Sequence, residues 1–96
     1  MAEPEKVVFI VDDDEGIRDA LELLLQSLGL VTRAFASGQE FLDQHRVSDR
    51  GCVVMDVDLP GVGGLQIHEI LKRRRSSLPI IFITGHSDIP MAVDSM

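Results

Sequence analysis

Hydrophobic residues along this chain fall into two kinds of pattern, and the two kinds alternate. Short apolar runs rich in β-branched and aromatic residues predict strands. Between them, apolar residues recur every three or four positions, which predicts amphipathic helices. Strands are expected at residues 6–11, 30–35, 52–57 and 79–84, and helices at 16–28, 38–45, 65–75 and from 88 onward. Strict alternation of strands and helices predicts an α/β protein with a doubly wound parallel sheet.

Local signals mark several of these boundaries. Gly29 follows the last apolar position of the first helix, where glycine commonly ends helices. Ser37 and Glu40 have the spacing of a capping box, so the second helix should begin just after Ser37. The strand at 30–35 contains more polar residues and is expected near an edge of the sheet.

The third strand ends in a carboxylate. Its continuous apolar run predicts burial on both faces, with Cys52 as a small buried packing residue. Asp56 lies at its end, Asp12 and Asp13 follow the first strand, and Thr84 ends the fourth. Parallel strands end at one edge of the sheet, where such folds bind ligands, so these side chains should converge if their strands are neighbours.

Composition narrows the class of protein. Ninety-six residues, of which 45% are hydrophobic, predict a single domain with a core. A net charge of −7 argues against direct contact with nucleic acid but permits a cation site. A single cysteine excludes an internal disulfide, and no apolar run is long enough for a membrane span. These features predict a cytoplasmic protein that does not contact a membrane.

Three converging carboxylates would repel one another unless a cation joins them. Carboxylate and carbonyl oxygens suit a hard divalent cation, which indicates Mg²⁺, with Ca²⁺ or Mn²⁺ as possible substitutes. With the cation in place, Asp56 could act as a nucleophile toward phosphorus. The Thr84 hydroxyl and the backbone N–H of Gly85 could then donate to phosphoryl oxygens.

The motifs at the three strand ends resemble those of the receiver domain of two-component response regulators. They are residues 8–14 (VFIVDDD), 54–64 (VMDVDLPGVGG) and 81–86 (IFITGH). Residues 84–93 (TGHSDIPMAV) resemble the FixJ-like branch, whose receivers precede a LuxR-type DNA-binding domain. The resemblance covers essentially the whole chain. It implies a flavodoxin-like (CheY-like) fold with strand order 2-1-3-4, and control of an attached transcriptional output domain.

The resemblance also implies a role for each site residue. Asp56 would be the phosphoacceptor, taking a phosphoryl group from a sensor histidine kinase. Asp13 would bind Mg²⁺ directly, Asp12 through water, and Asp58 through its backbone carbonyl. Thr84 would be the switch hydroxyl. Such a domain accepts and slowly loses a phosphoryl group, so it is not expected to be a turnover enzyme.

One part of the family pattern is missing. Receivers have a fifth strand with a phosphate-pairing lysine and then a fifth helix, yet no lysine follows Lys72. Residues 1–96 are therefore expected to be a C-terminally incomplete receiver. The exposed fourth strand, near Ile81, or the face of the fourth helix could then support a homodimer.

Three alternatives stay open from the residues. Asp56 and Asp58 match the acidic pair of haloacid dehalogenase phosphatases, although such a pair normally follows the first strand. A flavodoxin-like nucleotide-binding module would need a phosphate loop where residues 12–15 are all acidic. The missing lysine also allows an interaction fragment that works without phosphorylation.

Overall fold

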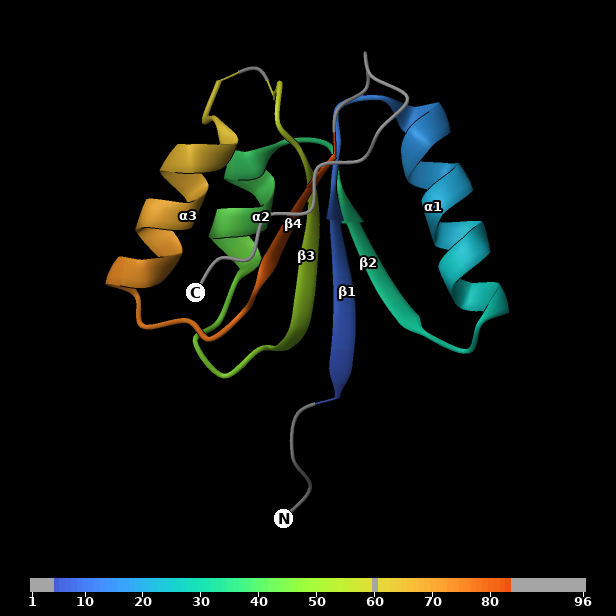
Figure 1. Cartoon of the computed structure of the whole chain (residues 1–96), viewed down its shortest axis with the longest axis horizontal. Coiled ribbons are helices and arrows are strands. Elements are labelled where there is room, and N and C mark those ends of the chain that lie inside the picture. Colours follow the sequence, from blue (N-terminus) through green and yellow to red (C-terminus); the bar gives the residue numbers. More distant parts are fainter. Residues whose placement is uncertain (1–4, 60, 84–96) are drawn as a thin grey trace.

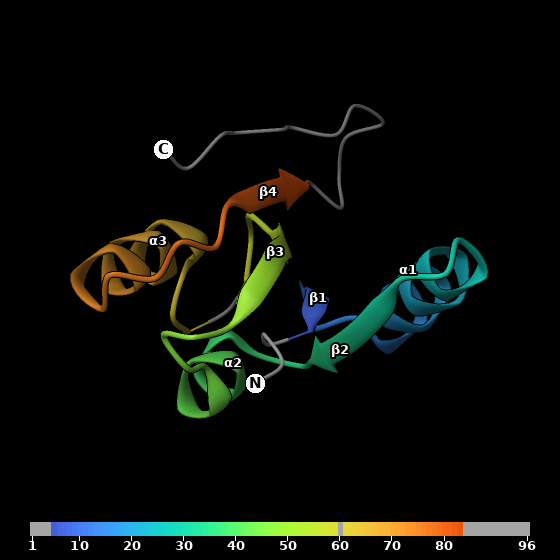
Figure 2. The same ribbon diagram turned by 90° about the horizontal axis from the view of Figure 1, so that it is seen from below.

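A computed structural model describes residues 5–59 and 61–83 and contains a four-stranded sheet between helices. Its elements are β1 (Lys6–Val11), α1 (Glu15–Ser27), β2 (Val31–Phe35), α2 (Gly38–Gln44), β3 (Arg50–Asp56), α3 (Gly64–Arg73) and β4 (Ile80–Ile83). All strand pairs are parallel, in the order β2-β1-β3-β4 (Figure 1). Helix α1 lies on one face of the sheet and α2 and α3 on the other (Figure 2). The predicted doubly wound sheet and its strand order are confirmed.

The helix ends follow from side chains that the sequence places there. Asp14 caps α1, because its Oδ1 accepts hydrogen bonds from the N–H groups of Gly16 and Ile17. Ser37 caps α2 by accepting from the N–H of Glu40 at 3.2 Å, as predicted. After α1, Gly29 adopts a left-handed φ of 84°, which lets its N–H and that of Leu30 close the last turn. The helix predicted from residue 88 lies outside the described residues.

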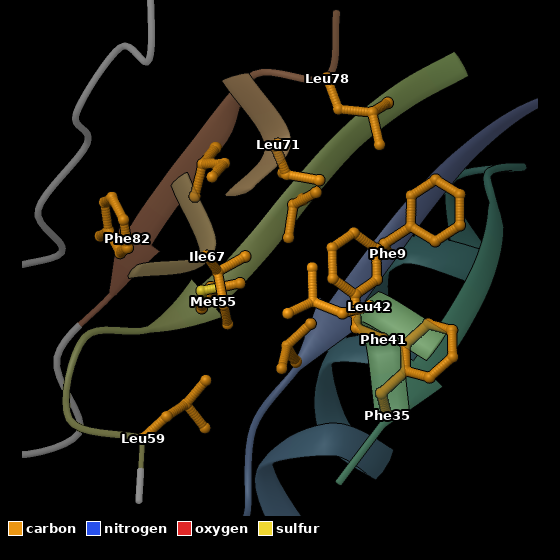
Figure 3. Packing of buried hydrophobic residues seen from close by; sticks show 13 residues of the cluster. Phe9, Phe35, Phe41, Leu42, Met55, Leu59, Ile67, Leu71, Leu78 and Phe82 are labelled. Carbon is orange, nitrogen blue, oxygen red and sulfur yellow. The ribbon is translucent and has the colours of Figure 1, made fainter. Parts of the chain in front are cut away.

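The hydrophobic core fills the space between the sheet and the helices α2 and α3 (Figure 3). Phe9, Phe35 and Phe41 form an aromatic group whose ring centroids are 5.6–6.5 Å apart. Ile67 and Leu71 project from α3 onto the same face of the sheet, and both are buried. The core therefore anchors β1 and β3, the two strands that end in the acidic residues.

The prediction that β3 is buried on both faces was wrong, and the apolar face of α1 is largely exposed. In β3, Val53 and Met55 are fully buried, but Cys52 and Val54 on the opposite face are only half-buried. The helical period of α1 marks an apolar face, yet Leu24 is 58% exposed and Leu28 is 68% exposed. The reason is the same in both cases: within the described residues, α1 is the only helix on that side of the sheet (Figure 2).

His45 closes the C-terminal end of α2 and should make the fold sensitive to acid. Its Nε2 lies 3.1 Å from the Ser76 hydroxyl, and its ring packs on Phe41. Burial lowers the pKa of His45, the positive charge of Arg74 acts in the same direction, and the carboxylate of Asp49 opposes them. The unfolded chain therefore binds a proton more readily, so stability is lost as pH falls through about 6.5.

We expect His45→Gln to remove this part of the acid sensitivity. Urea unfolding at pH 7.5 and pH 5.5, followed by circular dichroism, measures it. The native chain should lose more stability than His45→Gln between the two pH values. An equal loss in both proteins would show that protonation of His45 does not matter.

Candidate functional site

The strand register brings two of the predicted site residues side by side. Val11 pairs with Met55 in neighbouring parallel strands, so the next residues, Asp12 and Asp56, are also adjacent. Side chains alternate along a strand, which points both carboxylates to the face opposite the aromatic core. The backbone N–H of Asp12 donates to the carbonyl of Phe35 at 3.2 Å, which continues the sheet to this position. β1 and β3 therefore fix both carboxylates at the C-terminal edge of the sheet.

A third carboxylate joins this pair from the loop after β1. Carboxylate oxygens of Asp12, Asp13 and Asp56 all lie within 4.8 Å of one another. Asp12 is 1% exposed and Asp56 is 8% exposed, whereas Asp13 is exposed to solvent. Asp12 and Asp56 thus form the buried side of the cluster, and Asp13 lies on the side that is open to incoming groups.

Asp12 itself tests whether these residues fit a cation. Its Oδ1 accepts a hydrogen bond from the N–H of Asp14 at 2.9 Å, but its buried Oδ2 has no partner among the described residues. Burial raises the pKa of Asp12; the charges of Asp56 and Asp13 add to this, and the N–H of Asp14 opposes it. A buried oxygen without a partner among the described residues, in a cluster of three carboxylates, suits a hard divalent cation such as Mg²⁺.

The backbone after β3 turns around Asp56. The N–H of Asp58 donates to Oδ1 of Asp56 at 2.9 Å, which keeps Asp58 beside the cluster. Coordination by the Asp58 carbonyl stays a prediction. Thr84 and Gly85, the predicted donors to a phosphoryl group, lie outside the described residues.

One contact at the site has no counterpart in the sequence predictions. The guanidinium of Arg18, on α1, donates through Nη1 to the backbone carbonyl of Asp12 at 2.7 Å. An arginine six residues after Asp12 has many possible partners, so no motif identified Arg18 in the sequence.

Comparison with known proteins decides which class of acidic site this is. Residues 8–96 match the family described as the response regulator receiver domain. The chain belongs to this family. The match includes most of β1, the other three strands and all three clustered aspartates, so it covers the described site and nearly all of the sheet.

Curated relatives of this receiver domain include transcriptional regulators. It is 42% identical over 94 residues to the transcriptional regulatory protein FixJ of Azorhizobium caulinodans, covering 97% of this chain and 44% of FixJ. It is 41% identical over 96 residues to the response regulator protein TodT of Pseudomonas putida, covering all of this chain and 42% of TodT. The chain thus spans less than half the length of these relatives. Neither relative is described as a phosphatase, so that alternative gains no support.

Solved structures of receivers superpose well on this domain. The response regulator StyR gives a TM-score of 0.81 at 41% identity, over 96% of this chain and 46% of StyR. The crystal structure of FixJ-N gives a TM-score of 0.74 at 33% identity, over 96% of this chain and 74% of that one. Both agree with the parallel sheet found here. No helix in the described part of this receiver is both long and apolar enough to cross a membrane.

Asp12→Asn should raise the stability of the metal-free fold but remove most of the stabilisation by Mg²⁺. Because the raised pKa of Asp12 favours its protonated form in the fold, the metal-free receiver gains stability as pH falls through that pKa. At pH 7.5 the ionised carboxylate of Asp12 therefore lowers the free energy of unfolding of the metal-free receiver. Asp12→Asn should raise this free energy by about 1 kcal/mol. The stabilisation that Mg²⁺ gives the native chain should largely disappear in the variant.

Thermal unfolding in EDTA and in Mg²⁺ tests both effects of Asp12→Asn. The matched control is Asp19→Asn, which removes a charge from an exposed position on α1. Lower stability of Asp12→Asn in EDTA would contradict the expected cost of the buried charge. Unchanged stabilisation by Mg²⁺ would contradict the assignment of the metal site.

Proposed function

We propose that this receiver accepts a phosphoryl group on Asp56, with Mg²⁺ held by Asp12, Asp13, Asp56 and the Asp58 carbonyl. The supporting observation is the cluster of three carboxylates, with Asp56 at the end of a buried strand and Asp13 on the open side. In this arrangement Asp13 binds the ion directly and Asp12 acts through water. Ca²⁺ or Mn²⁺ can take the same place, since all three ions prefer oxygen ligands.

The hydrogen bond from the Asp58 N–H prepares Asp56 for reaction. It occupies Oδ1 and fixes the plane of the carboxylate, so Oδ2 is the nucleophile. When Oδ2 attacks phosphorus, the bond from phosphorus to the donor's imidazole nitrogen breaks, and that nitrogen keeps the electron pair. When bound, Mg²⁺ neutralises charge on the phosphoryl oxygens and on the carboxylates.

Donors beyond β4 complete the proposed site. The Thr84 hydroxyl and the Gly85 N–H donate to phosphoryl oxygens once Asp56 is modified, and Thr84 acts as the switch. Water later hydrolyses the acyl phosphate slowly, so the domain is a switch and not a turnover enzyme.

The phosphoryl donor in the proposed pathway is a sensor histidine kinase in the cytoplasm. The names of FixJ and TodT describe a transcriptional regulatory protein and a response regulator. By analogy, phosphorylation of this receiver controls a transcriptional output domain, while the receiver itself makes no direct contact with DNA. Association of two receivers through β4 or through the region after it stays a prediction.

A small phosphodonor tests this proposal without the kinase. Incubation with acetyl phosphate and Mg²⁺, followed by intact mass spectrometry, should show one added phosphoryl group. The same incubation with EDTA should show none. A folded chain that binds Mg²⁺ but gains no adduct would instead support the interaction fragment that works without phosphorylation.

A further inference from the structure

Two side chains join the loop that carries Asp12 and Asp13 to α1 among the described residues: Asp14, which caps the helix, and Arg18, which contacts Asp12 itself. Arg18 lies in the second turn of α1 and is half-buried. Its guanidinium reaches back across the start of the helix and donates to the Asp12 carbonyl at 2.7 Å. This contact joins the helix to the end of β1, directly before Asp13.

Among the described residues, three hydrogen bonds hold Asp12, and they differ in the groups that provide them. The Asp12 N–H donates to Phe35, and the Asp12 Oδ1 accepts from Asp14, so both of these bonds involve backbone groups of other residues. Of these three bonds, only the one to the Asp12 carbonyl comes from the side chain of another residue, Arg18. The position of Asp12 can therefore be perturbed by changing one side chain that is not itself an acidic ligand.

We propose that Arg18 is a positioning residue for the cation, and that it sets the direction of the Asp12 and Asp13 carboxylates. This inference rests on the proposed metal site and extends it to a cationic residue. Fixing the Asp12 carbonyl fixes the peptide plane between Asp12 and Asp13, and that plane determines where the Asp13 side chain begins. Groups that orient metal ligands commonly affect affinity although they do not touch the metal.

The charge of Arg18 makes this role distinguishable from simple electrostatics. A guanidinium beside a cation site repels the cation, so removing its charge should tighten binding if charge alone matters. If Arg18 orients the ligands, its removal should weaken binding despite the lost repulsion. The two explanations thus predict opposite signs for the same substitution.

The experiment measures Mn²⁺ affinity by electron paramagnetic resonance and Mg²⁺ affinity by calorimetry, using the full chain. Arg18→Gln should bind both ions about tenfold more weakly than the native chain. Arg18→Lys keeps the charge and one donor group, and it should recover part of the loss. Arg73→Gln is the matched control, because it makes the same charge change at an exposed position. Arg73 is the last residue of α3, and this end of α3 lies away from the sheet edge that carries the aspartates (Figure 1). The Arg73→Gln variant should therefore bind both ions with native affinity.

Each outcome decides one question. Failure of the native chain to bind either ion would overturn the proposed metal site itself. Native binding combined with equal or tighter binding by Arg18→Gln would overturn only the role of Arg18. A lower melting temperature in EDTA with native ion affinity would mean that Arg18 is merely structural. If Arg18→Gln does not fold, Arg18→Lys decides, and native affinity in that variant overturns the proposal.

Discussion

Asparagine at position 56 should abolish phosphorylation of this receiver while preserving its fold. The amide has nearly the same shape as the carboxylate, but its nitrogen and oxygen are poor nucleophiles toward phosphorus. Loss of a nucleophile commonly costs more than about 1000-fold in rate. With acetyl phosphate and Mg²⁺, the adduct should therefore fall below detection in Asp56→Asn and remain in the native chain.

The neighbouring carboxylates are alternative acceptors, so Asp56→Asn tests whether Asp56 itself takes the phosphoryl group. Asp13 is exposed and lies within the same cluster, so it is the closest alternative acceptor. The control is Asp43→Asn, the same substitution at an exposed position on α2. This variant should gain the phosphoryl adduct as the native chain does. A persistent adduct in Asp56→Asn, mapped by peptide mass spectrometry to Asp13, would overturn the assignment of Asp56.

The positions of the three aspartates could be predicted because they depend only on topology. A strand–helix alternation indicates parallel strands, and parallel strands end at a common edge. Asp12 and Asp56 each stand at such an end, and the β1–β3 register then brings them together. No knowledge of side-chain packing was needed for this step.

Burial on the α1 side of the sheet could not be predicted in the same way. A helical period shows which residues share a face, but it does not show what covers that face. Leu24 and Leu28 follow the period and are nevertheless exposed, and Cys52 is only half-buried in an apolar strand. Burial still raises the pKa of the Cys52 thiol, which makes it a weak nucleophile.

The Arg18 contact shows a second limit of sequence reasoning. Arginine has a long flexible side chain, and its partner here is a backbone carbonyl, which every residue possesses. The roles of Thr84 and Gly85 have a different basis, since they rest on strand-end chemistry and on family resemblance. Specific side-chain partners can therefore be identified only in a three-dimensional structure. Residues at the ends of parallel strands can be predicted from the order of helices and strands.

Gly51 is the position where a single methyl group should do the greatest damage to the fold. Gly51 pairs with Val7 in the two central strands and has a φ of 126°, which residues with a side chain rarely adopt. A Cβ built at Gly51 would lie 1.8 Å from the Val7 carbonyl oxygen and 2.7 Å from the Val7 nitrogen. These are backbone atoms of β1, so no change of rotamer can relieve the overlap.

Gly51→Ala should therefore reduce the free energy of unfolding by more than about 4 kcal/mol, a large share of the stability of a small domain. Gly29→Ala is the matched control, because its φ of 84° is also left-handed but a Cβ there would meet no atom within 4 Å beyond the residue itself and its chain neighbours. The control should lose only about 1 kcal/mol.

The chain contains no Trp and no Tyr, so urea unfolding is followed by far-ultraviolet circular dichroism. Equal losses in the two variants would mean that the backbone angle alone limits position 51 and that β1 can move away from β3.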